Sequence, residues 1–179
     1  AWGALRGDLA HLFGSVPLLS TSLAQAVQYF TFGMVEVWLT IYLDERIGLE
    51  TWQIGTLFTA ESVVVFLTRP FTGRLSDRWG RVPFVTAGLL LSGGSMALMP
   101  WATSFALWFL LIGLFGLGLS TVTASTTAFV ADLSRASTHG AAQGALSSIM
   151  DVGQTLGPIV GGLLVASLDY TRAFGWVGL

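Results

Sequence analysis

Long apolar runs separated by short polar segments dominate the sequence. Five of the runs have about 20 residues or more, the length that an α-helix needs to cross a bilayer. We expect membrane spans at residues 17–43, 52–72, 83–101, 105–131 and 140–168. A further apolar run occupies residues 173–179. The pattern predicts an all-α polytopic membrane protein with five complete transmembrane helices and the start of a sixth.

The polar segments predict which side of the membrane each helix end faces. The segment at residues 73–83, GRLSDRWGRVP, is too charged for hydrocarbon, so we expect a loop at a membrane face. We call it the arginine segment. Basic loops stay on the cytoplasmic side, and the acidic segment at 44–50 is then expected outside. This threading places six arginines inside and two outside: Arg6, Arg69, Arg74, Arg78, Arg81 and Arg135 against Arg46 and Arg172.

Composition agrees with a membrane protein and argues against several other classes. Of the 179 residues, 53% are hydrophobic and 10% are charged, whereas soluble domains carry about 25% charge. The net charge of −2 indicates no nucleic-acid partner. The chain has no cysteine, and both histidines, His11 and His139, lie outside the apolar runs. We therefore expect no metal site, no cofactor and no enzyme activity.

Three acidic residues lie within the expected spans: Glu36, Glu61 and Asp151. A charged side chain is costly in hydrocarbon, so each is a candidate functional residue. Hydrocarbon disfavours the charged form of a carboxylate, which suits a group that binds and releases a proton as its surroundings change. The same positions also fit a solvated end, a static ion pair or a packing role. Further candidates for proton or substrate contact are Gln25, Gln28 and Gln154.

The fifth span carries a packing face beside a polar face. Gly153, Gly157 and Gly161 recur every four residues, a spacing that lets two membrane helices approach closely. Pro158 removes a backbone donor and can bend the helix. The neighbouring polar positions, which we expect to line a cavity, are Gln143, Ser147, Asp151 and Gln154.

Two motifs resemble those of the major facilitator superfamily. The arginine segment is similar to the loop between the second and third helices of each six-helix half, with matches at Gly73, Asp77, Arg78, Gly80 and Arg81; the last basic position of that pattern is Val82 here. The fifth span resembles the glycine-proline pattern of the family's exporters, with matches at Gly144, Gly153, Gly157, Pro158, Gly161 and Gly162.

The resemblance implies one half of a twelve-helix bundle, formed by residues 17–179. Residues 1–16 are then an amphipathic preamble, either a helix on the membrane surface or the end of a central linker. The glycine-proline pattern is typical of helix five and favours the amino-terminal half. Residues 130–132 with 151–154 look more like helices ten and eleven, and with the preamble they lead us to favour the carboxy-terminal half.

The resemblance also implies a function. We expect a secondary active transporter that works by alternating access, with proton coupling and efflux of a small molecule favoured. The matched residues of the arginine segment are expected to latch one conformation against the other half of the same polypeptide. The other expected partners are the lipid bilayer, a small-molecule substrate and protons, in a multi-pass protein of a prokaryotic cell membrane. Metabolite uptake by symport and a non-transporting scaffold or receptor are the alternatives.

Overall fold

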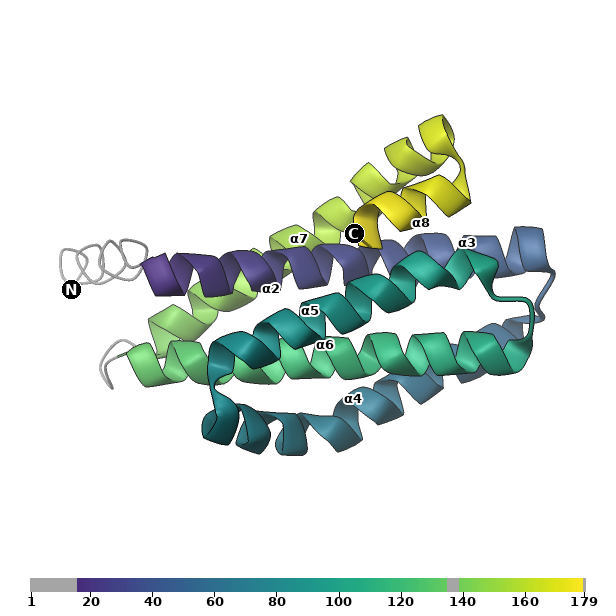
Figure 1. Cartoon of the computed structure of the whole chain (residues 1–179). Coiled ribbons are helices and arrows are strands. Elements are labelled where there is room, and N and C mark those ends of the chain that lie inside the picture. The colour runs from purple at the N-terminus through teal and green to yellow at the C-terminus, as the bar shows by residue number, and fades with distance from the viewer. Residues whose placement is uncertain (1–15, 135–138, 179) are drawn as a thin grey trace.

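The computed structural model describes residues 16–134 and 139–178, and helices make up nearly all of them (Figure 1). Within these ranges no strand occurs. Residues 1–15 of the preamble, with Arg6 and His11, residues 135–138, with Arg135, and residue 179 lie outside the described residues, whereas Val16 already belongs to α2. The elements in chain order are α2 (Val16–Met34), the π-helix η1 (Val35–Leu39), α3 (Thr40–Tyr42), the π-helix η2 (Leu43–Ile47), α4 (Thr51–Trp79), α5 (Arg81–Leu98), the 3-10 helix η3 (Met99–Trp101), α6 (Phe105–Leu133), α7 (His139–Leu168) and α8 (Tyr170–Gly178).

Among the residues that the structure describes, five helical stretches are long and apolar enough to cross a membrane, as the sequence predicted. They run back and forth across the bundle (Figure 1). One end of the bundle holds the start of α2, the α4–α5 junction, the end of α6 and the start of α7. The η2–α4, α5–α6 and α7–α8 connections share the opposite end. Arg74, Arg78 and Arg81 therefore lie at the first end, and Arg46 and Arg172 at the second, which is the separation that the charge pattern predicted.

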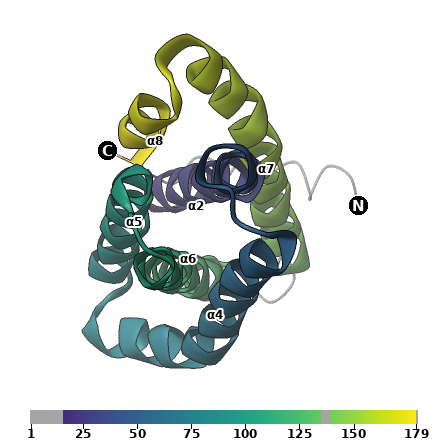
Figure 2. The same cartoon turned by 90° about the vertical axis from the view of Figure 1, so that its right-hand side faces the viewer.

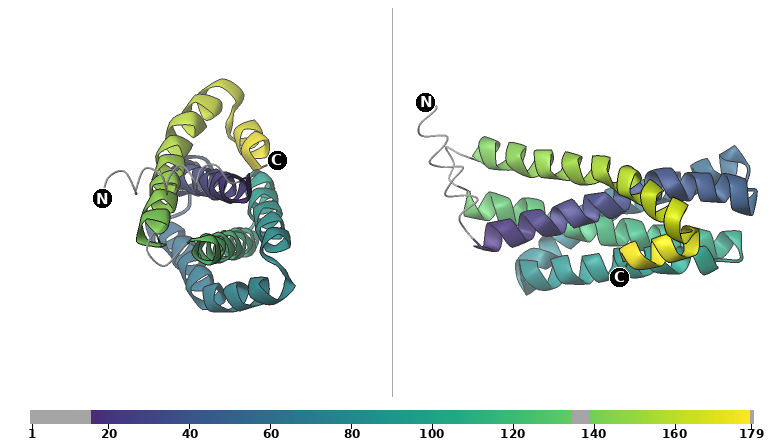
Figure 3. Two further views of the ribbon diagram at one scale, coloured as in Figure 1. Left: turned by 90° about the vertical axis from the view of Figure 1, so that its left-hand side faces the viewer. Right: turned by 90° about the horizontal axis from the view of Figure 1, so that it is seen from above.

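Two helices, α2 and α6, lie at the centre of the bundle (Figures 2 and 3). The first packs against α7, α6 and α5, while the second packs against α5, α4, α2 and α7. The apolar core includes Met34, Leu39, Leu57, Ile112 and Phe115, each fully buried. This one cluster joins residues of α2, α4 and α6, the helices that contribute to the site described below.

Glycine lets α5 and α6 come together at nearly backbone contact. A Cβ on Gly118 would stand 2.7 Å from the Gly88 carbonyl oxygen and 2.8 Å from the Ser92 Cβ. Such distances leave no room for any side chain, so close packing requires glycine at this crossing. The fourth span is rich in small residues, and Gly118 is one whose small size this contact requires.

The predicted helix ends in the two charged segments were wrong. The arginine segment was expected to be a loop, yet α4 continues to Trp79 and α5 begins at Arg81, so Gly80 alone separates them. Gly80 has φ +101° and makes the turn, whereas Gly73 is an ordinary helical residue. Residues 44–47 were likewise expected in a loop but belong to η2, which ends at Gly48 with φ +75°. Charge does not end a helix once it has left hydrocarbon; a backbone that departs from helical geometry does.

The remaining expected boundaries shift by a few residues. The outer turn at Asp169–Arg172 is reduced to Asp169, which has φ +75°, and α8 already begins at Tyr170 rather than at residue 173. The expected loop at 132–139 is shorter, because α6 reaches Leu133 and α7 starts at His139. Ser104 begins α6 by accepting a hydrogen bond from the Leu107 N–H at 3.3 Å, as helix N-caps do.

Candidate transport site

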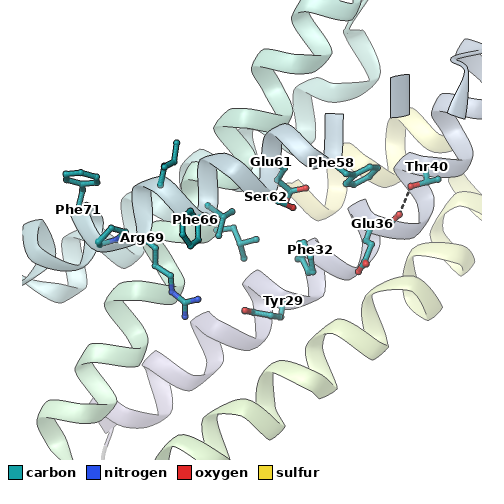
Figure 4. Close-up of a pocket in the computed structure, with 14 residues that line it drawn as sticks. Tyr29, Phe32, Glu36, Thr40, Phe58, Glu61, Ser62, Phe66, Arg69 and Phe71 are labelled. Carbon is teal, nitrogen blue, oxygen red and sulfur yellow. Dashed lines mark hydrogen bonds between the residues drawn. The ribbon is translucent and has the colours of Figure 1, made fainter. Parts of the chain in front are cut away.

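A cleft of 1160 Å³ lies between the α2–α3 stretch and α4 (Figure 4), and Leu119 of α6 also lines it. Two carboxylates from different helices reach its wall: Glu36 from η1 and Glu61 from α4. Aromatic rings make up much of the rest of the lining, and Arg69 lies towards the Tyr29 side (Figure 4). The arrangement suits a molecule with an apolar body and at least one polar or charged group.

Glu61 is the more enclosed of the two acids, with 4% of its surface exposed. Its Oε1 atom accepts no hydrogen bond from any residue that the structure describes. Gly116 of α6 lies directly beside it, because a Cβ there would stand 2.9 Å from the Glu61 Cγ. A carboxylate that is buried without a partner is costly to keep, so its position at a cleft wall makes Glu61 a candidate functional residue.

Glu36 is exposed to the cleft and is held from the opposite side. Its Oε2 accepts a hydrogen bond from Gln154 Nε2 of α7 at 3.2 Å. It lies in η1, the π-helical turn that interrupts the first span, and such turns occur frequently at functional sites. Thr40 closes the turn by donating to the main-chain carbonyl of Glu36 at 2.6 Å. The first span is therefore irregular at the level where its acid enters the cleft.

The structure brings Glu36, Glu61 and Gln154 into one neighbourhood but separates the other three candidates from it. Gln25 and Gln28 are fully buried and do not line the cleft. Gln28 accepts a hydrogen bond from Ser92 of α5 at 2.7 Å. Gln25 accepts one from Thr126 of α6. These glutamines tie α2 to its neighbours, and Asp151 lies on an exposed part of α7 away from the cleft.

Several lining residues were not singled out from the sequence. Phe58, Ser62, Phe66 and Arg69 all line the cleft from α4. They recur at intervals of three or four residues, the spacing of one helix face. This periodicity was visible in the sequence, but nothing there shows which face of the second span is turned towards the first.

The arginine segment forms a small ion-pair network at the end of the bundle where α4 meets α5. Arg81 at the start of α5 pairs with Asp77 of α4 and with Asp132 of α6 at 2.8 Å. It also donates to the Ser76 hydroxyl at 3.1 Å. One guanidinium thus connects the ends of three helices within this half, while Arg78 is exposed to solvent.

The glycines of α7 lie against α2. A Cβ on Gly153 would overlap the Ala26 carbonyl, and one on Gly157 would overlap the Phe30 carbonyl. Gly161 and Gly162 lie against Trp38, with 2.9 Å and 2.7 Å from their would-be Cβ atoms to its ring. Gly144 has open space around it. The glycine-proline pattern therefore supports the helix that carries Glu36.

The comparisons with known proteins decide the family. The model of the Major Facilitator Superfamily matches residues 21–179. The chain belongs to this superfamily. Its five long helices and the short α8 are consistent with one half of a major facilitator bundle, and the chain is a multi-pass protein of the cell membrane. Which half it represents stays a prediction.

Curated relatives of this major facilitator chain are bacterial resistance transporters. It is 35% identical to the class C tetracycline resistance protein of Escherichia coli over 113 residues, 63% of this chain and 28% of that protein. It is 29% identical to the tetracenomycin C resistance and export protein of Streptomyces glaucescens over 166 residues, covering 87% and 30%. The quinolone resistance protein NorA of Staphylococcus aureus is 27% identical over 150 residues, covering 84% and 38%. The chain thus spans less than half the length of each relative.

Proposed function

We propose that this chain is part of a secondary active exporter that exchanges protons for a small amphipathic molecule. The observation that carries the proposal is the 1160 Å³ cleft into which two in-span carboxylates project from different helices. Alternating access places substrate and coupling-ion sites near the middle of the membrane, at the interface between two bundles. The cleft lies between spans and is bounded by only part of the bundle, as a half-site would be.

The two acids have different roles in this proposal. Glu61, buried and without a described partner, is the proton carrier, because loss of its charge relieves an enclosed carboxylate. Glu36, exposed to the cleft, meets the polar end of the substrate. The rings of Tyr29, Phe32 and Phe58 would contact its apolar body.

Export rather than uptake is favoured by the relatives. The names of the three relatives given above include resistance, and one includes export. Resistance by a membrane transporter means that the compound leaves the cell. In this proposal the arginine segment also latches one conformation, through contacts of Asp77, Arg78 and Arg81 with the other half.

The test uses the full-length transporter in everted vesicles whose interior is acidified, with tetracycline and ethidium as probes. An exchanger releases protons from the vesicle when a probe is added, and a pH-sensitive dye reports the release. Wild-type protein is expected to respond, and Glu61→Gln to abolish the response while still allowing probe exchange at equal concentrations. Probe leaving the vesicle together with protons would indicate symport. No flux of either probe in either direction would contradict the proposal in favour of a scaffold.

A further inference from the structure

The contact between the first span and α7 includes a hydrogen bond that the transport proposal does not use. Gln154 donates its side-chain amide to Glu36 across the two helices at 3.2 Å. Its own main-chain carbonyl lies against Gly33, where a Cβ would overlap that oxygen. Side chain and backbone of one residue thus contact two positions of the first span that are three residues apart.

Pro158 explains why this carbonyl is available. In an α-helix the N–H of a residue donates to the carbonyl four residues earlier, and Pro158 has no N–H to give to Gln154. The freed oxygen faces Gly33 instead. On the other side of Glu36, Trp38 donates its indole N–H to the Pro158 carbonyl at 2.7 Å.

Glu36 is therefore bracketed on both sides along the first span. Gly33 precedes it and meets the Gln154 backbone, and Trp38 follows it and is bonded to Pro158. The π-helical turn η1 begins between these two contacts and holds both Glu36 and Trp38. These two contacts fix the position of η1 along α7. The hydrogen bond from the Gln154 amide then orients the Glu36 carboxylate.

We propose that Gln154 is a positioning residue that holds the Glu36 carboxylate at the cleft. A primary amide suits this task, because it donates a hydrogen bond to a carboxylate and carries no charge of its own. The freed backbone carbonyl and the Trp38–Pro158 bond keep the amide within reach as α2 and α7 move together. This inference rests on the proposed function, since Gln154 acts only through Glu36.

Full-length protein in everted vesicles tests the proposal with Gln154→Met, which keeps length and apolar bulk but has no donor. Ethidium is the probe. We expect the maximum rate to fall about tenfold, the size that loss of a hydrogen bond to a charged group produces. Gln154→Asn keeps the amide on a side chain one methylene shorter, and its maximum rate is expected to lie between those of wild type and Gln154→Met. The result therefore does not depend on the folding of one variant. Gln143 was expected to line the cavity but does not line the cleft. Gln143→Met on the same helix loses a 3.1 Å bond to the Thr127 carbonyl and is the matched control, expected within about twofold of wild type.

Exchanging the two partners separates positioning from packing. The double variant Glu36→Gln with Gln154→Glu places an amide and a carboxylate at the same joint in reverse order, and we expect it to recover at least about a third of the wild-type rate, as coupled residues do. Infrared difference spectra give a second measure, because the carboxyl band lost in Glu36→Gln should shift in Gln154→Met.

The outcomes distinguish the two proposals. A Gln154→Met variant with wild-type rate and an unshifted band, alongside an inactive Glu36→Gln, would overturn the positioning role and leave the proposed function intact. A Glu36→Gln variant that transports at the wild-type rate would remove the role proposed for Glu36. A double variant no faster than Glu36→Gln alone would also count against positioning.

Discussion

At the scale of single residues, the position of Glu61 depends on a glycine that no motif marked. Gly116 of α6 leaves 2.9 Å between a would-be Cβ and the Glu61 Cγ, and 3.1 Å to the Glu61 carbonyl oxygen. The absent side chain is what allows a carboxylate to sit at the crossing of α4 and α6. Glu61 therefore owes its burial to its neighbour as much as to its place in the span.

Gly116→Ala should disturb Glu61 directly. The added methyl group forces the acid or the helix backbone to shift, and overpacking of this kind costs about 1–3 kcal/mol. We expect a lower melting temperature for the full-length protein and proton-coupled transport reduced about tenfold or more, the result of displacing a reacting group by about an ångström. Thermal unfolding in detergent and the vesicle assay measure the two effects.

Gly113→Ala is the matched control, on the same helix one turn earlier. Its would-be Cβ has its nearest neighbour, Val64 Cγ2, at 4.0 Å, so a methyl group fits. A gain of a few tenths of a kcal/mol is expected there, since alanine favours a helix over glycine by up to about 1 kcal/mol. Equal losses in both variants would show that α6 tolerates no change and that Glu61 is not specifically affected.

At the scale of elements, the contact between α2 and α7 consists of backbone against backbone. Gly157 leaves so little space that a Cβ would overlap the Phe30 carbonyl and stand 2.9 Å from the Met34 nitrogen. Neither atom can move without moving the whole helix. Glycine, rather than side-chain packing, therefore sets the spacing between these two helices, which together position Glu36.

Gly157→Ala is therefore expected to separate α2 from α7. The stability loss should be at the upper end of the overpacking range, about 3 kcal/mol, because backbone atoms are the obstacle. Gly144→Ala on the same helix has nothing within 4 Å of its Cβ and should be neutral or slightly stabilising. The midpoint of thermal unfolding, followed by tryptophan fluorescence, compares them; a neutral Gly157→Ala would mean that the helices are farther apart than described.

The sequence predicted the elements better than it predicted their ends or their faces. Hydrophobic runs of sufficient length specify spans, and all five were found. The ends at η2 and α4 were missed because their charged residues continue the helix into water until Gly48 and Gly80 reverse φ. The inward orientation of Gln25 and Gln28 could not be read either, since their partners Thr126 and Ser92 lie 101 and 64 residues further along the chain. A polar face looks the same in sequence whether it meets a cleft or a neighbouring helix.

At the scale of the whole molecule, the fold separates a buried core from a broad apolar surface. Phe66 and Phe71 of α4 and Leu163 of α7 each expose more than two thirds of their surface. In a membrane protein such residues face lipid or another bundle. Since both Phe66 and Phe71 also line the cleft, we expect that side of α4 to be closed by the other half of the transporter.

The orientation of the bundle in the membrane follows from the two groups of arginines at its ends, and it can be tested by thiol labelling. This chain has no cysteine, so a single introduced cysteine provides a unique label within it. Glu45→Cys lies at the end with Arg46, and Arg74→Cys lies at the end with Arg78; both positions are exposed. Because basic segments stay on the cytoplasmic side, intact cells treated with a membrane-impermeant maleimide should label Glu45→Cys and leave Arg74→Cys unlabelled.

Everted vesicles provide the reciprocal measurement, since they present the cytoplasmic face to the reagent. There Arg74→Cys should be labelled and Glu45→Cys protected, provided that any cysteine outside this chain is replaced first. Labelling of Arg74→Cys in intact cells would show that the bundle has the opposite orientation. The arginine segment would then lie at the wrong face to contact the cytoplasmic side of the partner half. Protection of both positions from both sides would place the ion-pair network of Arg81 within a closed interface instead.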